Sequence, residues 1–154
     1  MLSDFLKPKQ ILFGINVKNK KNLFQELSLR SNLVNKFIDQ KILFDKIIKR
    51  EKLGNTSISN GVAMPSALLD EINETFVLFT ILSKPIDYGA ADKRPVDLVC
   101  LVISPSSSSS KHLYVLSNFS RLLKNKNIAL QLRGCENSDS FFAVLLNFNL
   151  SSAA

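Results

Sequence analysis

The stretch from Arg50 to Asp70 holds the residues of this chain that are best suited to chemistry. Arg50 carries a planar guanidinium group, which suits phosphate. A polar loop follows at residues 54–61, where Gly and Asn accept positive φ at low cost, so backbone N–H groups can turn inward around an anion. Thr56 and Asn60 add short side-chain donors. These residues predict an anion site, although the same stretch also fits a polar surface loop between a helix and a strand with no ligand.

The order of the residues in this stretch adds a resemblance to a known family. The pattern R-E-x-x-G-x-T-x-x-x-N-G-V-A-x-P, from Arg50 to Pro65, resembles the active-site segment of the phosphotransferase-system (PTS) IIA proteins of the fructose/mannitol type. Within that family it is most similar to the nitrogen-regulatory IIA proteins. Their motif continues with a histidine that carries a phosphoryl group. In this chain Ser66 follows Pro65, so the resemblance implies a site whose phosphoacceptor has been replaced.

His112 is the only histidine of the chain. We expect Ser110 to cap a helix over residues 111–125, which places His112 in a first turn where N–H groups and the helix dipole favour an anion. Taken alone, the residue also fits an ordinary surface histidine. Residues 112–116, HLYVL, match the H-L-x-x-L with which the family opens a helix. The resemblance therefore implies that His112 supports the phosphorylated residue and that Arg50 neutralises the phosphoryl group.

These matches lead to one prediction about the site. We expect five residues to converge on one surface pocket: Arg50, Thr56, Asn60, Ser66 and His112. Four of them, all except Ser66, are the candidate phosphate- or anion-binding residues, and Ser66 occupies the phosphoacceptor position. No metal site and no cofactor is expected, because Cys100 and Cys135 are far apart and match no metal or redox spacing.

Helix and strand patterns alternate along the chain, which indicates an α/β layer fold. Strands are expected at 11–15, 62–64, 75–82 and 96–103, and helices at 20–31, 40–52, 111–125, 127–133 and 139–148. Asn19 and Asp39 are expected to be the N-caps of the first two helices. The two long apolar strands alternate little and should be buried on both faces, with Phe24, Leu78, Leu98, Cys100 and Val102 in the core. Residues 85–88 and 95–99 also match the family's P-I-x-F and P-V-D-L-V segments. The resemblance implies one domain over residues 2–148, a mixed β-sheet flanked by helices, and the tail at 149–154 should fray.

Composition narrows the class of protein further. Its 154 residues are 45% hydrophobic, enough for a core, yet no apolar run approaches the roughly 20 residues that span a bilayer. Without a signal-peptide pattern or a membrane insertion segment, a cytoplasmic protein is expected. The net charge of +7 comes from residues 1–52, where 12 Lys and Arg face 5 Asp and Glu. These charges are dispersed without interleaved aromatic residues, so nucleic acid is not favoured as a partner.

Three functional hypotheses follow, and whether the chain is an enzyme stays open. The first is a regulatory IIA-like protein of a phosphoenolpyruvate-dependent phosphoryl relay that carries no phosphate and binds an HPr-like phosphocarrier or regulatory target proteins. It rests on Ser66, because an aliphatic hydroxyl needs an activating base and its phosphate ester is too stable to pass on. The second is a residual phosphocarrier that uses His112. The third is a scaffold or transporter accessory protein without an anion site.

Overall fold

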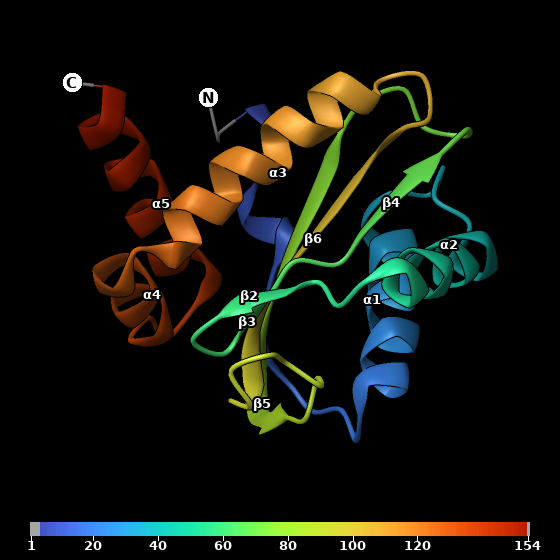
Figure 1. Ribbon diagram of the computed structural model, residues 1–154. Helices are drawn as coiled ribbons and strands as arrows, with labels where there is room; N and C mark the ends of the chain where they lie inside the picture. Colours follow the sequence, from blue (N-terminus) through green and yellow to red (C-terminus); the bar gives the residue numbers. More distant parts are fainter. Residues whose placement is uncertain (1–3, 154) are drawn as a thin grey trace.

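The structure is a computed structural model that describes the backbone of residues 4–153 and the side chains of residues 4–148. Residues 2 and 3 of the expected domain, and Ala154 of the expected tail, lie outside these limits. The elements in chain order are η2 (Pro8–Gln10), β1 (Ile11–Ile15), α1 (Lys20–Val34), α2 (Gln40–Leu53), β2 (Ser57–Ser59), β3 (Val62–Ala63), β4 (Ser66–Leu69), β5 (Phe76–Ile86), β6 (Val96–Pro105), α3 (Ser109–Lys124), α4 (Lys126–Arg133) and α5 (Ser138–Ala153) (Figure 1).

One mixed six-stranded sheet organises the chain. The strand order is β1-β5-β6-β3-β2, and β4 pairs with β6 beyond the end of β3. β1 runs parallel to β5, β5 and β6 are antiparallel, and β3 and β4 both run parallel to β6. The prediction of an α/β fold with a mixed sheet flanked by helices is confirmed.

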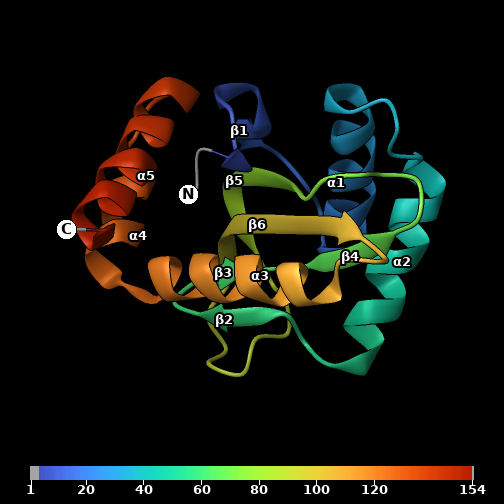
Figure 2. The same ribbon diagram turned by 90° about the horizontal axis from the view of Figure 1, so that it is seen from above.

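Helices cover both faces of the sheet. α1 and α2 lie on one face, and α3, α4 and α5 lie on the other (Figures 1 and 2). Strand β6 serves both layers: Val99 and Leu101 point into the α1–α2 core, whereas Leu98, Cys100 and Val102 point into the α3–α5 core. The residues predicted to be buried are buried, since Leu78, Leu98, Cys100 and Val102 are 0% exposed and Phe24 is 1% exposed.

The predicted helix caps were right in two places and wrong in a third. Asn19 and Asp39 each accept a hydrogen bond from the backbone N–H three residues later, as N-caps do. For α3, however, the residue at the N-cap position is Ser108 rather than Ser110, and its side chain makes no capping bond. Five consecutive serines are chemically equivalent as caps, so the sequence alone could not select one of them.

Several elements are longer than the patterns indicate. α1 continues past Ser31 to Val34, and Ser28 and Ser31 lie on its buried face, where the Ser28 hydroxyl donates to the Phe24 carbonyl. β5 continues past Leu82 to Ile86, which pairs with Val96 after an irregularity in the register. α5 extends through Ala153, beyond the expected end at Phe148.

Strand β4, like the short strand β2, was not predicted from the sequence. Its four residues, Ser66–Leu69, are too few for a pattern and follow Pro65, which reads as a turn. Tertiary pairing creates this strand, because β6 extends beyond β3 and offers free backbone groups to a parallel partner. Among the residues that the structure describes, no helix is long and apolar enough to cross a membrane.

Candidate functional site

Ser66 opens strand β4 at the carboxyl-terminal half of β6. It lies opposite Val102, and the preceding Pro65 carbonyl accepts a hydrogen bond of 3.1 Å from the Val102 N–H. Residues opposite one another in register point to the same face of a sheet. Val102 faces the α3–α5 layer, so Ser66 does too, and it is only 5% exposed.

His112 approaches the same end of the sheet from helix α3. Its ring is buried, with 7% of the residue exposed, and its Nδ1 lies 2.7 Å from Ser104 Oγ. Ser104 stands two residues beyond Val102 on β6, on the same face as Val102 and Ser66. Two strand residues span about 7 Å, so Ser66 and His112 lie close together at this end of the sheet.

The environment of His112 keeps its ring neutral. Burial lowers the pKa of His112, and the positive charge of Arg50 lowers it further. The usual pKa of histidine is about 6.5 and that of His112 is lower, so the ring is uncharged at neutral pH. Nδ1 is engaged with Ser104, whereas Nε2 has no hydrogen-bond partner among the described residues.

Arg50 flanks the site from helix α2, which packs against β4. Its guanidinium group is exposed, and its Nη1 donates one hydrogen bond of 2.9 Å to the Gly54 carbonyl. Its charge lowers the pKa of His112 and also, as a weak effect, that of Tyr88. Arg50 is therefore near enough to His112 for their electrostatic interaction to matter, and no described carboxylate pairs with it.

Thr56 does not present its donors to an anion. Its N–H and its hydroxyl both donate to the Glu51 carboxylate, at 3.0 and 2.6 Å, and its hydroxyl lies 2.7 Å from the Tyr88 hydroxyl. Lys20 forms an ion pair of 2.7 Å with Glu51 and lies over the Tyr88 ring. The Thr56 N–H and hydroxyl are therefore engaged with α2 and with the segment after β5.

Asn60 lies apart from the other predicted site residues. It sits in the β2–β3 turn with φ +54°, its N–H donates to Asp92, and its Oδ1 accepts from Arg94. The neighbouring Gly61 carbonyl accepts from Asp97 N–H, and Asp97 is five residues before Val102 on β6, a span of about 16 Å. The expectation that Asn60 joins Ser66 and His112 in one pocket does not fit this placement.

Sequence reasoning missed the residues that fix the loop. Glu51 and Tyr88 both hydrogen-bond Thr56, and burial, together with the charge of Glu51, raises the pKa of the Tyr88 hydroxyl far above its usual value. A signal existed, because both residues belong to the segments that carry the resemblance. Arg133 carried no such signal, and it donates to both Asp97 and the Asn60 carbonyl from helix α4.

The arrangement limits what Ser66 can do chemically. No hydrogen bond joins Ser66 to His112 among the described residues, so the hydroxyl lacks the general base that would make it a nucleophile. The neutral His112 with an unengaged Nε2 retains the features of a nucleophile or hydrogen-bond partner. Residues 4–148 contain no group of three or more His, Cys, Asp or Glu side chains that could hold a metal ion.

Comparison with known proteins assigns the family. The model of the phosphoenolpyruvate-dependent sugar phosphotransferase system EIIA type 2 family matches residues 4–148. The chain belongs to this family. It is 34% identical over 145 residues to a nitrogen regulatory protein of Bradyrhizobium diazoefficiens, with 94% of each chain covered. It is 31% identical over 153 residues to a nitrogen regulatory protein homolog of Haemophilus influenzae, covering 93% of this chain and 89% of the relative.

Solved structures agree with this assignment. The crystal structure of the nitrogen regulatory protein IIA-Ntr from Neisseria meningitidis superposes with a TM-score of 0.86 at 26% identity, covering 94% of this chain and 98% of that one. The mannitol IIA protein of Escherichia coli, solved in complex with phosphorylated IIB, gives a TM-score of 0.77 over 92% of this chain and 97% of that one. At 16% identity the second likeness shows the fold alone.

Proposed function

We propose that this PTS IIA protein is a regulatory protein of the nitrogen-regulatory type that does not carry phosphate on Ser66 and acts by binding other proteins. The proposal rests on Ser66, which stands at the acceptor position by the resemblance of the motif and whose hydroxyl is not hydrogen-bonded to His112. A phosphate ester on serine would also be too stable to pass on. The names of the Bradyrhizobium and Haemophilus relatives support the regulatory role.

Exposed apolar side chains around the site support a role in protein binding. Leu113 follows His112 on α3 and is 66% exposed, and Leu53 at the end of α2 is 85% exposed. Both belong to helices that carry a candidate site residue, Arg50 or His112. A partner that bound either side chain would contact a helix that carries a candidate site residue. We propose an HPr-like phosphocarrier or a regulatory target protein as this partner.

A second candidate function rests on His112. Its ring is neutral, its Nε2 has no described partner, and the Arg50 charge lies nearby. Transfer of a phosphoryl group to that nitrogen would break the bond between phosphorus and the donor histidine and form a new P–N bond at His112. Arg50 would stabilise the charge on the transferring group, which is where most phosphoryl-transfer catalysis lies.

Labelling separates the two functions. The protein is incubated with radiolabelled phosphoenolpyruvate and the phosphohistidine donor proteins of its own organism. The regulatory proposal expects no transfer to the chain, together with measurable binding to the donor or to a target. Acid-labile label that disappears in His112→Ala would overturn it in favour of the second function. A third possibility, a scaffold without an anion site, predicts no NMR shifts near Arg50 when inorganic phosphate is added.

A further inference from the structure

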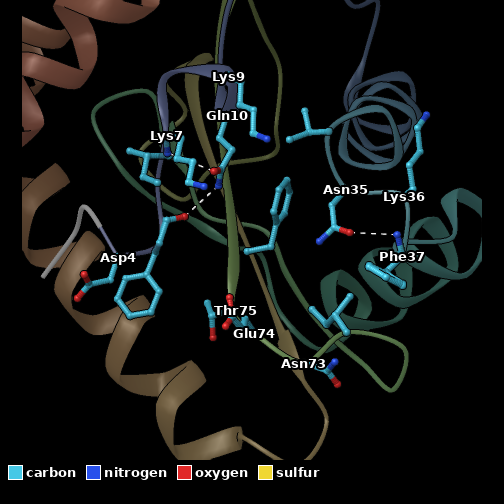
Figure 3. A pocket seen from close by; sticks show the side chains of 15 residues that line it. Asp4, Lys7, Lys9, Gln10, Asn35, Lys36, Phe37, Asn73, Glu74 and Thr75 are labelled. Atoms are coloured by element: carbon cyan, nitrogen blue, oxygen red, sulfur yellow. Dashed lines mark hydrogen bonds between the residues drawn. The ribbon is translucent and has the colours of Figure 1, made fainter.

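A second pocket lies at the end of the molecule where β5 begins. It is lined by residues from 4–10, 34–37 and 72–76, and its volume is about 560 Å³ (Figure 3). We call it the N-terminal pocket. Its walls come from the segment before β1, from the α1–α2 loop and from the β4–β5 connection. Neither Arg50 nor Ser66 lines it, so it is separate from the site described above.

The N-terminal pocket is rich in unpaired cations. Lys7, Lys9 and Lys36 line it, and none of them forms an ion pair or a side-chain hydrogen bond with any described residue. Two carboxylates, Asp4 and Glu74, line it as well. In Figure 3 these acids lie along its left and lower side, whereas Lys9 lies above and Asn35 at the right. The part of the pocket that Lys9 faces is therefore cationic and lies away from the two acids.

Asn35 is held in a fixed orientation in this cationic part. Its Oδ1 accepts a hydrogen bond of 3.0 Å from the Phe37 N–H, which leaves the two hydrogens of Nδ2 as donors. Figure 3 shows this amide nitrogen directed into the pocket, and the Lys9 ammonium group directed toward the same space. One amide and one ammonium group can together bind the two oxygens of a carboxylate, or two oxygens of a phosphate.

Apolar side chains surround these donors. Ile72 and Phe76 are buried in the pocket wall, and Phe37 stands at the rim with 78% of its surface exposed. An aromatic side chain this exposed gains stability when a ligand or partner covers it. A ligand that fits both features has an anionic head and a small apolar body.

A buried chain of hydroxyl groups links the pocket to His112. Thr75 lines the pocket, and its Oγ1 lies 3.1 Å from Ser104 Oγ, which lies 2.7 Å from His112 Nδ1. The three residues are 8%, 0% and 7% exposed, so water does not readily replace these contacts. A displacement of Thr75 changes which partner the Ser104 hydroxyl bonds, and so changes the hydrogen bond at the His112 ring.

We infer that the N-terminal pocket binds a small organic anion, whose carboxylate or phosphate contacts Lys9 and Asn35 while its apolar body contacts Phe37. We further infer that occupancy of the pocket is transmitted to the His112 ring through Thr75 and Ser104. Neither step depends on whether Ser66 or His112 carries phosphate, so this inference stands apart from the proposed function.

Binding is tested by NMR titration of the ¹⁵N-labelled full chain. Benzoate and phenyl phosphate are the probes, and neutral benzamide is the control with the same ring. Saturable shifts of the Asn35 side-chain amide and the Phe37 N–H are expected with at least one anion but not with benzamide, and the tighter anion identifies the preferred head group. Lys9→Met should weaken that binding at least fivefold. The Lys36 ammonium group points away from the pocket in Figure 3, so Lys36→Met should change the affinity by less than twofold.

Three results would overturn the binding site. One is the absence of saturable shifts with both anions. Another is benzamide binding as tightly as the anions. The last is equal weakening by Lys9→Met and Lys36→Met, which would mean that the anions respond only to the general positive charge of this end of the chain.

The link to His112 is tested through the ¹⁵N shifts of its ring. Saturation with the bound anion should move these shifts, and Thr75→Val should abolish the response without changing the affinity more than twofold. Thr80→Val is the control, because it removes a buried hydroxyl from the adjoining strand β5 that hydrogen-bonds neither Ser104 nor His112. A ring that does not respond to the anion, or a response that survives Thr75→Val, would overturn the link.

Discussion

The two ends of strand β6 carry polar groups that are arranged in opposite ways. At its amino-terminal end, Asp97 accepts hydrogen bonds of 3.1 and 2.8 Å from Nε and Nη2 of Arg133. The same Nη2 donates to the Asn60 carbonyl at 2.7 Å. The charges of Asp97 and Arg133 therefore pair with each other, and Arg133 links the β2–β3 turn to helix α4 by a hydrogen bond.

Toward the carboxyl-terminal end, the one cation of the candidate site, Arg50, has no carboxylate partner among the described residues. Arg50 donates only to the Gly54 carbonyl among the described residues, and His112 bonds the neutral hydroxyl of Ser104. Ser66 lies on the same face without a described side-chain partner. A cation without a carboxylate partner is free to attract an anion or a charged protein surface.

This difference separates residues that look equivalent in the sequence. Asn60 and Ser66 are six residues apart in one polar motif, yet the first fixes a turn and the second faces the candidate site. Paired groups stabilise the fold, whereas unpaired groups remain available for binding. Four predictions test this contrast, from the largest expected effect to the smallest.

Ser66→His should give the largest change, from no detectable phosphoryl transfer to measurable acid-labile label. The imidazole would lie on the same face of the sheet as His112, and Arg50 supplies a positive charge that acts on His112. Transfer from a phosphohistidine donor with labelled phosphoenolpyruvate measures it. The double variant Ser66→His with Arg50→Met should label more slowly. A Ser66→His protein that stays unlabelled would contradict the prediction that the imidazole is the missing group.

Gly61→Ala should destabilise the paired end strongly. Gly61 has φ +80°, and an added Cβ would lie 2.9 Å from Arg133 Nη2 and 3.0 Å from the Pro95 carbonyl. Backbone strain together with this clash should lower the free energy of unfolding by about 2 to 3 kcal/mol, measured by urea denaturation. Gly14→Ala is the control, since Gly14 has φ +70° and open space around it, and should cost about 1 kcal/mol. Equal losses for the two variants would remove the role assigned to the Arg133 contact.

Arg133→Met and Arg50→Met compare the two ends directly, because each removes one cation. The first deletes three hydrogen bonds and leaves Asp97 unpaired, so unfolding free energy should fall by about 1 to 2 kcal/mol, a figure discounted for partial exposure. The second removes one exposed bond and should change stability by less than about 0.5 kcal/mol. Urea denaturation of both variants under the same conditions measures the two losses of unfolding free energy. A larger loss for Arg50→Met would contradict the contrast between a paired and an unpaired end.

Arg50→Gln should give the smallest effect, a modest rise in the pKa of His112. The Arg50 charge disfavours the protonated ring, so its removal moves the value back toward that of free histidine, while burial still holds it lower. NMR titration of the ring measures the shift. Because the folded pKa is the lower one, the unfolded chain takes up protons first as pH falls below about 6.5, so His112 costs stability there and nothing above it. An unchanged pKa in Arg50→Gln would place Arg50 too far away to act on the site.

Much of the architecture could be predicted from the sequence. The apolar strands and helices revealed the two-sided core, and Asn19 and Asp39 acted as predicted caps. The family motif also identified Arg50, Ser66 and His112 as the residues to examine. These signals are local, because periodicity, capping chemistry and residue order all lie within short windows of the chain.

Tertiary structure decided the rest. Strand β4 exists because β6 offers it a pairing partner, and only this pairing turns Ser66 toward α3. The Thr56 N–H and hydroxyl are not available to an anion, because they are hydrogen-bonded to Glu51 and Tyr88. Asn60 lies at the other end of β6, where it is hydrogen-bonded to Asp92, Arg94 and Arg133. A donor without a hydrogen-bond partner among its sequence neighbours can be bonded by a residue more than 30 positions away. The sequence by itself therefore determined which residues could do chemistry, and the long-range hydrogen bonds determined which of them remain available for it.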